Sequence, residues 1–78
     1  MDDALAVLRA AVARSHEGKQ IGPDVRLALK ALRFVGIPAA DIRYFWESCG
    51  VDHDIGRSQS MSAAFNRIEL IHQGKPVS

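Results

Sequence analysis

Hydrophobic residues recur at every third or fourth position along most of this chain, which is the spacing of a helix with one apolar side. Three short segments that contain glycine interrupt the spacing, at residues 17–23, 36–38 and 50–57. The uninterrupted stretches predict four helices, at residues 3–15, 23–35, 38–49 and 58–73. The pattern therefore predicts an all-α fold, a compact bundle of four helices that can contain a three-helix core of the helix-turn-helix type.

Residues at the expected helix ends agree with this division. Pro23 and Pro38 suit the first turn of a helix, and Ser58 or Ser60 is the expected N-cap of the fourth helix. Glycine suits the position just after a helix and is expected to end the later three, at Gly36, Gly50 and Gly74.

The apolar positions also predict how the helices pack. The second predicted helix is apolar around most of its circumference, so we expect it to be the central and most buried helix. In the third, Phe45, Trp46 and Cys49 lie on the inward stripe with Ile42, and the aromatic run at residues 44–46 is expected to supply much of the core.

Composition narrows the class of protein. The chain has 78 residues, of which 47% are hydrophobic, so we expect one small folded domain that spans residues 1–78. Ten basic residues face nine acidic ones, and a net charge of +1 argues against a protein that holds nucleic acid by overall charge alone. No apolar run approaches the roughly 18 residues of a membrane span, and the first residues do not form a basic and then apolar leader. We therefore expect a cytoplasmic protein that does not contact a membrane.

Candidate catalytic and metal-binding groups are sparse. The single cysteine excludes an internal disulfide framework and a four-cysteine zinc site. Cys49 lies on an inward stripe, where burial raises the pKa of a thiol and makes it unreactive. The three histidines lie in different segments, and the loop sequence Asp52-His53-Asp54 is a poor metal site by itself. We therefore expect no enzyme activity, no metal and no cofactor.

Residues 31–45 have the spacing of two helices joined by a short turn, as in a helix-turn-helix motif or in a plain helical hairpin. In such a motif the second helix would present these side chains to DNA: Ala39, Ala40, Arg43, Tyr44 and Glu47. Alanine offers no hydrogen bond to a base, and glutamate repels phosphate. The plain hairpin is therefore the interpretation that we favour for this segment.

A stronger candidate for DNA contact is the stretch Gly56-Arg57-Ser58-Gln59-Ser60-Met61-Ser62-Ala63-Ala64-Phe65-Asn66-Arg67-Ile68-Glu69. It resembles the start of the recognition helix in bacterial helix-turn-helix regulators, which often open on Ser-Gln-Ser and later carry Arg, an apolar residue and Glu. The match is local, covers residues 56–69 alone, needs a one-residue gap and follows a long link. The resemblance implies DNA contacts from Arg57, Ser58, Gln59, Ser60, Ser62, Asn66 and Arg67, with glutamine suited to adenine and arginine to guanine or phosphate.

Three cations on the second predicted helix form a further candidate, which we call the basic row: Arg26, Lys30 and Arg33. Their spacing of four and then three residues places them on one side of the helix. Such a row can follow DNA phosphates, contact an acidic protein surface, or simply face solvent. It gains weight as a phosphate clamp if Arg57 and Arg67 lie on the same side of the fold.

Two functions follow from these features. The first is a small DNA-binding transcriptional regulator that acts on duplex DNA as a homodimer, with the fourth helix as the reader. The alternative is a non-enzymatic helical protein–protein interaction module, an adaptor, inhibitor or assembly subunit that binds a protein partner. Its contact patch would consist of the apolar residues beside the main stripes, Leu27, Phe34, Tyr44 and Leu70, if they are exposed together. A ligand sensor around Trp46 is a weaker third idea, because no phosphate-binding feature accompanies it.

Overall fold

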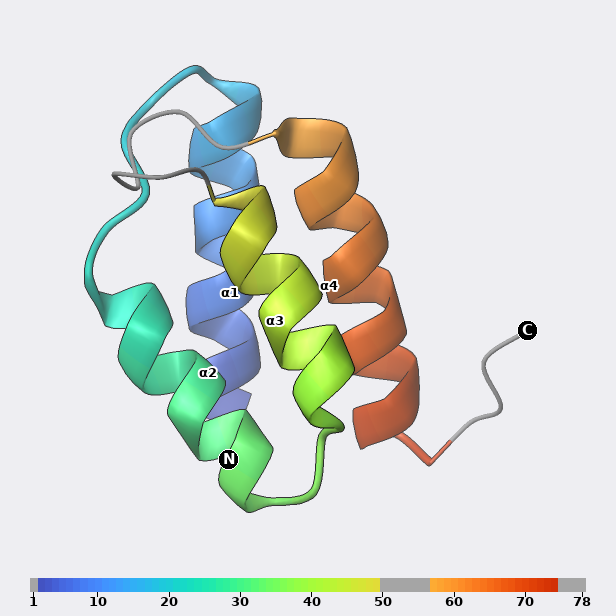
Figure 1. The fold of residues 1–78 in the computed structure, drawn as a ribbon. Coiled ribbons are helices and arrows are strands. Elements are labelled where there is room, and N and C mark those ends of the chain that lie inside the picture. Colours follow the sequence, from blue (N-terminus) through green and yellow to red (C-terminus); the bar gives the residue numbers. More distant parts are fainter. Residues whose placement is uncertain (1, 50–56, 75–78) are drawn as a thin grey trace.

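The protein is a bundle of four helices, as described by a computed structural model that covers residues 2–49 and 57–74 (Figure 1). The helices are α1 (Asp2–His16), α2 (Asp24–Phe34), α3 (Ala39–Ser48) and α4 (Ser58–His72). No strand occurs within these two ranges. The all-α prediction is therefore confirmed, and each helix begins and ends within one residue of the boundary that the hydrophobic spacing predicts.

The helices alternate in direction along the bundle, and each packs against two others (Figure 1). α1 packs against α2 and α4, and α3 packs against the same two helices. α2 and α4 therefore lie diagonally across the bundle, as do α1 and α3. In this arrangement no helix is central, so the expectation that α2 is the most buried helix was wrong.

Two side-chain contacts hold α1 antiparallel to α4. Arg9 Nη2 donates a hydrogen bond to Glu69 Oε2 at 3.0 Å, and His16 Nε2 lies 3.1 Å from Ser62 Oγ. Moving seven residues along α1 thus moves seven residues back along α4, as an antiparallel register requires. The Arg9 guanidinium also lies 5.6 Å from the centre of the Phe65 ring, within the range of a cation–π contact.

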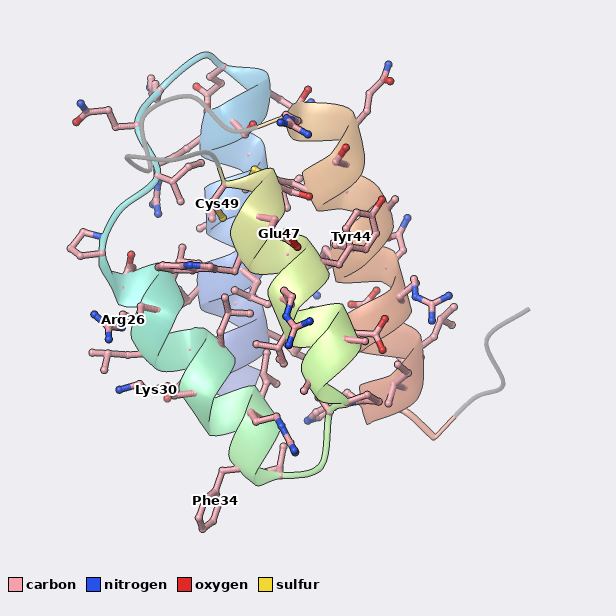
Figure 2. All side chains as sticks on the ribbon, viewed as in Figure 1. Arg26, Lys30, Phe34, Tyr44, Glu47 and Cys49 are labelled. Carbon is pink, nitrogen blue, oxygen red and sulfur yellow. The ribbon has the colours of Figure 1, made fainter. Side chains whose placement is uncertain are left out.

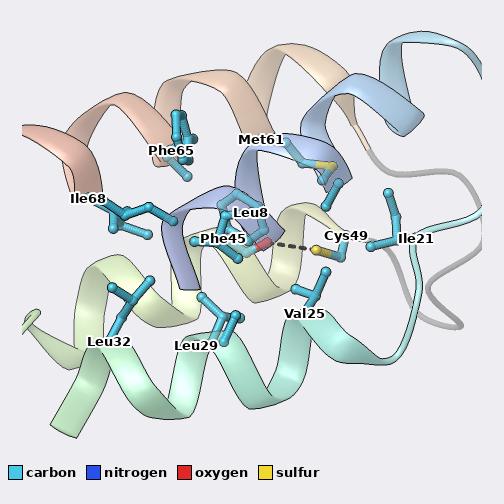
Figure 3. Close-up of a cluster of buried hydrophobic side chains, with 14 of the residues drawn as sticks. Leu8, Ile21, Val25, Leu29, Leu32, Phe45, Cys49, Met61, Phe65 and Ile68 are labelled. Atoms are coloured by element: carbon cyan, nitrogen blue, oxygen red, sulfur yellow. Dashed lines mark hydrogen bonds between the residues drawn. The ribbon is translucent and has the colours of Figure 1, made fainter. Parts of the chain in front are cut away.

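The hydrophobic core fills the space between the four helices (Figure 3). Phe45 is completely buried near its centre, whereas Tyr44 is 40% exposed and Trp46 is half-buried. The expectation that the aromatic run supplies the core therefore holds for Phe45 and in part for Trp46, which packs against the core, but not for Tyr44. The buried hydrophobic residues are Leu5, Leu8, Ala11, Ile21, Val25, Ala28, Leu29, Leu32, Ile37, Phe45, Cys49, Met61, Ala64, Phe65 and Ile68.

Gly36 ends α2, as predicted, because the chain there adopts a φ of +110° that side chains other than glycine rarely tolerate. The Gly36 N–H donates to the carbonyl of Arg33 at 3.2 Å, and the Ile37 N–H donates to the carbonyl of Leu32 at 3.1 Å. This pair of bonds is a Schellman motif, which is completed by an apolar contact across the turn. Ile37 and Leu32 are both buried, so the turn is fixed to the core on one side.

The start of α4 differs from the prediction. Arg57, with extended backbone, occupies the N-cap position and makes no capping hydrogen bond through its side chain. Ser58 is already helical, so neither it nor Ser60 is the cap, and that expectation was wrong. The Arg57 N–H instead donates to the carbonyl of Ser48 at 2.8 Å, which joins the start of α4 to the end of α3. Gly50, the expected end of α3, lies outside the described residues.

Candidate interaction surfaces

The side chains that resemble DNA readers lie at the start and along the outer side of α4. Arg57, Gln59 and Asn66 are exposed, and the three serines at positions 58, 60 and 62 are half-buried. Ser62 lies beside His16 of α1, as described above. With Arg67, which is also exposed, four of the seven residues are accessible, and they are spread over more than two turns of helix.

Arg67 belongs to a structural contact. Its Nε donates to Asp41 Oδ1 at 2.7 Å, and this ion pair joins α3 to α4. The Asp41 side chain is only 8% exposed, whereas that of Arg67 is 48% exposed. A carboxylate with so little access to water depends on its partner for charge compensation. The sequence did not suggest this pairing, because nothing local to Asp41 points to a residue so distant in the chain.

The basic row is exposed on α2 (Figure 2 labels Arg26 and Lys30). It does not share a helix–helix contact with the α4 residues, because α2 and α4 lie diagonally across the bundle. The two DNA-contact candidates therefore occupy different corners of the fold. In the described part of the chain, the basic row does not lie next to α4, the helix that we expected to read DNA.

A groove lies between α2 and α3, with a volume of about 310 Å³. Apolar side chains line it from both helices, Leu29 from α2 and Ile42 and Trp46 from α3. The whole basic row borders the same groove on the α2 side. We call this feature the α2–α3 groove. Ile42 and Trp46 pack against the core, as the inward stripe predicts, but both are only half-buried and so also line the groove.

A second apolar surface lies on α2 beside the basic row, and we call it the apolar strip: Leu27, Ala31 and Phe34. Phe34 is 92% exposed and Leu27 is 69% exposed, and Phe34 points away from the end of the bundle (Figure 2). A shallow hollow of about 320 Å³ runs beside the strip, where Ala4 and Val7 of α1 meet Leu27 and Ala31. Because contiguous exposed apolar patches are typical of contact surfaces, the strip is a candidate for contact with another molecule.

The expected contact patch divides between different places. Leu27 and Phe34 belong to the apolar strip, but Tyr44 lies on α3, on the side toward α4 (Figure 2), and Leu70 is half-buried in α4. The four residues thus do not form one surface. Within residues 2–49 and 57–74, the apolar strip is the surface that combines two large hydrophobic side chains more than 60% exposed on one helix.

Cys49, the one cysteine of the chain, is a packed core residue. Its Sγ lies 3.3 Å from the carbonyl oxygen of Phe45, to which the thiol donates a hydrogen bond (Figure 3). Burial raises the pKa of this thiol from 9.0 to about 11, so almost no thiolate exists near neutral pH. Among the described residues no three His, Cys, Asp or Glu side chains gather as metal ligands. The sequence Asp52-His53-Asp54 lies outside those residues.

Comparison with known proteins gives no relative: no family model, no curated protein and no solved structure matches this chain. None of the four helices in the described ranges has both the length and the apolar content that crossing a bilayer requires. The surfaces themselves therefore carry the argument about function.

Proposed function

We propose that this protein is a small non-enzymatic interaction module that pairs with a second copy of itself through the apolar strip. The observation that carries the proposal is the exposure of Phe34, at 92%, and of Leu27, at 69%, on one side of a single helix. Both side chains remain exposed in the folded monomer. Burying them between two copies therefore adds hydrophobic stabilisation that folding alone does not provide.

The spacing of the strip supports a symmetric contact. Leu27 and Phe34 are seven residues apart, so they lie two turns apart on the same side of α2. If two copies place their α2 helices antiparallel across a twofold axis near Ala31, Leu27 of each copy faces Phe34 of the other. The small side chain of Ala31 then permits close approach of the two helices at the centre.

The charges beside the strip give this contact a distinctive response to salt. Lys30 precedes Phe34 by one turn, and in a symmetric pair the same side of both helices meets, so the two basic rows repel each other. Salt screens such repulsion between exposed charges. Self-association through the strip is therefore expected to strengthen as the salt concentration rises.

Sedimentation equilibrium over a range of protein and salt concentrations tests the proposal. We expect a monomer–dimer equilibrium whose dissociation constant falls between about 50 and 500 mM NaCl. Phe34→Ser is expected to raise that constant roughly tenfold or more, because it removes the large aromatic contact that each copy contributes. Tyr44→Ser removes an exposed aromatic side chain from a different helix and serves as the matched control. A monomer at millimolar concentration, or equal loss in both variants, would show the proposal to be wrong.

DNA binding is the second candidate, and the exposure of the whole basic row favours it. Binding to random duplex DNA would weaken as salt rises, because each neutralised phosphate releases a counterion. This is the opposite of the salt response expected for the apolar strip. Lys30→Ala and Arg57→Ala test the two corners of the fold separately. Arg67→Ala is a poor test, because it also removes the partner of the buried Asp41 carboxylate.

A further inference from the structure

We infer that the α2–α3 groove binds an acidic amphipathic helix from another protein. The inference rests on the proposal that this chain is an interaction module, but it concerns the side of α2 that faces α3, which adjoins the apolar strip where Lys30 lies one turn from Phe34. The groove combines an apolar floor with a basic border, and that combination defines the chemistry of its occupant.

The floor of the groove fits the apolar side of a short helix. Ile42 and Trp46 are one turn apart on α3, and both are half-buried, so part of each side chain remains accessible. Leu29 of α2 closes the bottom of the groove. Grooves between two helices commonly accept an amphipathic helix whose apolar residues recur every three or four positions. Trp46 supplies the large, partly polar ring that is enriched in such contacts.

The border of the groove fits acidic residues on the flank of that helix. Arg26, Lys30 and Arg33 extend along seven residues of α2, about 10 Å or two turns. A partner helix that lies along the groove can place a carboxylate opposite each cation at similar spacing. Exposed ion pairs contribute little individually, but a matched row selects the charge and orientation of the partner.

Acidic residues of α2 and α3 do not neutralise this border. Asp24 lies 3.7 Å from Arg14 of α1, and Asp41 pairs with Arg67 of α4, so both carboxylates are directed away from the groove. Glu47 is exposed on the outer side of α3 (Figure 2), where Arg43 lies one turn earlier and is also exposed. The described charges on this side of the bundle are therefore mainly positive, although the chain as a whole carries a net charge of only +1.

The apolar floor favours a protein helix over a nucleic acid. A phosphate backbone needs cations and hydrogen-bond donors, and it gains little from Leu29 and Ile42. The remaining DNA candidates lie on α4, diagonally opposite α2, and do not extend the basic border of the groove. An amphipathic acidic helix uses both parts of the site.

Fluorescence provides a direct test, because Trp46 is the single tryptophan of the chain and lines the groove. The probe is a synthetic, tryptophan-free helical peptide of about 18 residues with leucine on one side and glutamate along both flanks. The same peptide with lysine in place of every glutamate is the control. We expect a saturable change in Trp46 emission with the acidic peptide and none with the basic one. The absence of any change up to millimolar acidic peptide would overturn the inference.

A pair of charge reversals tests whether the basic border is responsible. Lys30→Glu reverses a charge at the border of the groove. Lys19→Glu is the control, because it makes the same change in the exposed link between α1 and α2. We expect Lys30→Glu to raise the dissociation constant of the acidic peptide about fivefold at low salt, and Lys19→Glu to change it less than twofold. Circular dichroism confirms that both variants are folded. Equal effects of the two variants would show attraction to overall charge and would contradict the groove.

Two further measurements separate this inference from its competitors. Random duplex DNA that displaces the acidic peptide and binds more tightly than it would assign the groove to nucleic acid and overturn the inference. Phe34→Ser is expected to bind the acidic peptide as the wild type does, because Phe34 lies outside the groove. Loss of self-association in that variant with peptide binding retained would support the groove independently of the apolar strip.

Discussion

Asp41 is the clearest case of a residue whose role depends on a single distant partner. Its carboxylate is almost inaccessible to water and accepts a hydrogen bond from Arg67. Among the described residues, the Arg67 guanidinium is the cation that compensates this negative charge. Replacing it by asparagine retains the shape and removes the charge. The amide then offers Arg67 a weaker acceptor, and the free energy of unfolding is expected to fall by roughly 1–2 kcal/mol.

A double-mutant cycle checks this expectation for Asp41. Asp41→Asn, Arg67→Gln and the double variant are compared by urea unfolding, and the coupling between the two positions should account for most of the loss. The exposed pair Arg9–Glu69 provides the contrast, since Glu69→Gln is expected to cost less than about 1 kcal/mol. Equal losses at both pairs would contradict the importance of burial.

Cys49 gives the fold a dependence on alkaline pH. The pKa of its thiol is about 11 in the folded protein against 9.0 without burial, so the unfolded chain loses this proton first as pH rises. Between these two values the unfolded state binds fewer protons than the folded state, and the free energy of unfolding therefore falls with rising pH. The contribution is fully present below about pH 9 and is lost as pH approaches 11.

Unfolding curves at several pH values test the role of Cys49. The wild type is compared with Cys49→Ala, which lacks the titrating group, so that effects of the other side chains cancel in the difference. We expect the two stabilities to converge from about pH 9 upward. A thiol reagent should also fail to modify folded protein at about pH 8 and should react after denaturation. A constant difference across the pH range would argue against the raised pKa.

At the scale of single elements, the turn between α2 and α3 depends on one glycine. Gly36 has a φ of +110°, where a Cβ would meet no neighbouring atom within 4 Å but would strain the backbone. Gly36→Ala is therefore expected to lower the free energy of unfolding by about 1–2 kcal/mol through conformation alone.

Gly22→Ala is the informative comparison for Gly36. At Gly22 the φ is not positive, and an added Cβ would come within 2.7 Å of Asp24 Oδ1, the end of a side chain that can rotate away. We expect the smaller loss here, measured by thermal unfolding of both variants. A larger loss at Gly22 would mean that its contact with Asp24 matters more than the backbone strain at Gly36.

The helices were predictable from the sequence because their signals are local. Apolar spacing and the glycines at helix ends fix where each helix lies, and Gly36 and Gly74 both adopt the positive φ expected after a helix. The cap of α4 was not predictable in the same way, since Arg57 holds its place through the carbonyl of Ser48 rather than through a side chain. Backbone hydrogen bonds between separate helices leave no trace in residue type.

The candidate surfaces were less predictable, because they depend on which helices become neighbours. The basic row was identified from spacing on one helix, and Leu27 and Phe34 were identified as apolar residues beside the main stripes, but the position of these residues relative to other helices was not predicted. Trp46 illustrates the difficulty: it lies on the inward stripe of α3 by spacing, yet the separation of α2 and α3 leaves it in an open groove. The diagonal placement of α2 and α4 likewise has no signature in either helix alone.

At the scale of the whole molecule, stability is concentrated in a core that every helix shares. Phe45 is fully buried and Phe34 is 92% exposed. The same substitution therefore tests the contribution of core packing at Phe45 and of an exposed side chain at Phe34. Phe45→Ala is expected to cost about 3–5 kcal/mol, a large part of the total stability of a domain of this size. Phe34→Ala is expected to change the free energy of unfolding by less than about 0.5 kcal/mol.

Chemical unfolding of both variants, at a protein concentration that keeps the chain monomeric, decides this comparison. A substantial loss in Phe34→Ala under those conditions would mean that Phe34 stabilises the monomer. The apolar strip would then be part of the fold rather than a contact surface. A negligible loss leaves the exposure of Phe34 unexplained by folding, as the proposed pairing requires.

The antiparallel register of α1 and α4 also decides how this bundle can be joined to other chains. His16 lies beside Ser62 and Arg9 lies beside Glu69, so the same register places the first turn of α1 next to the last turn of α4. A fold that is entered and left at neighbouring points can be inserted into a surface loop of a host protein without separating the two ends of that loop. The bundle would then project from its host, with the groove and the strip on α2 both free to meet other molecules.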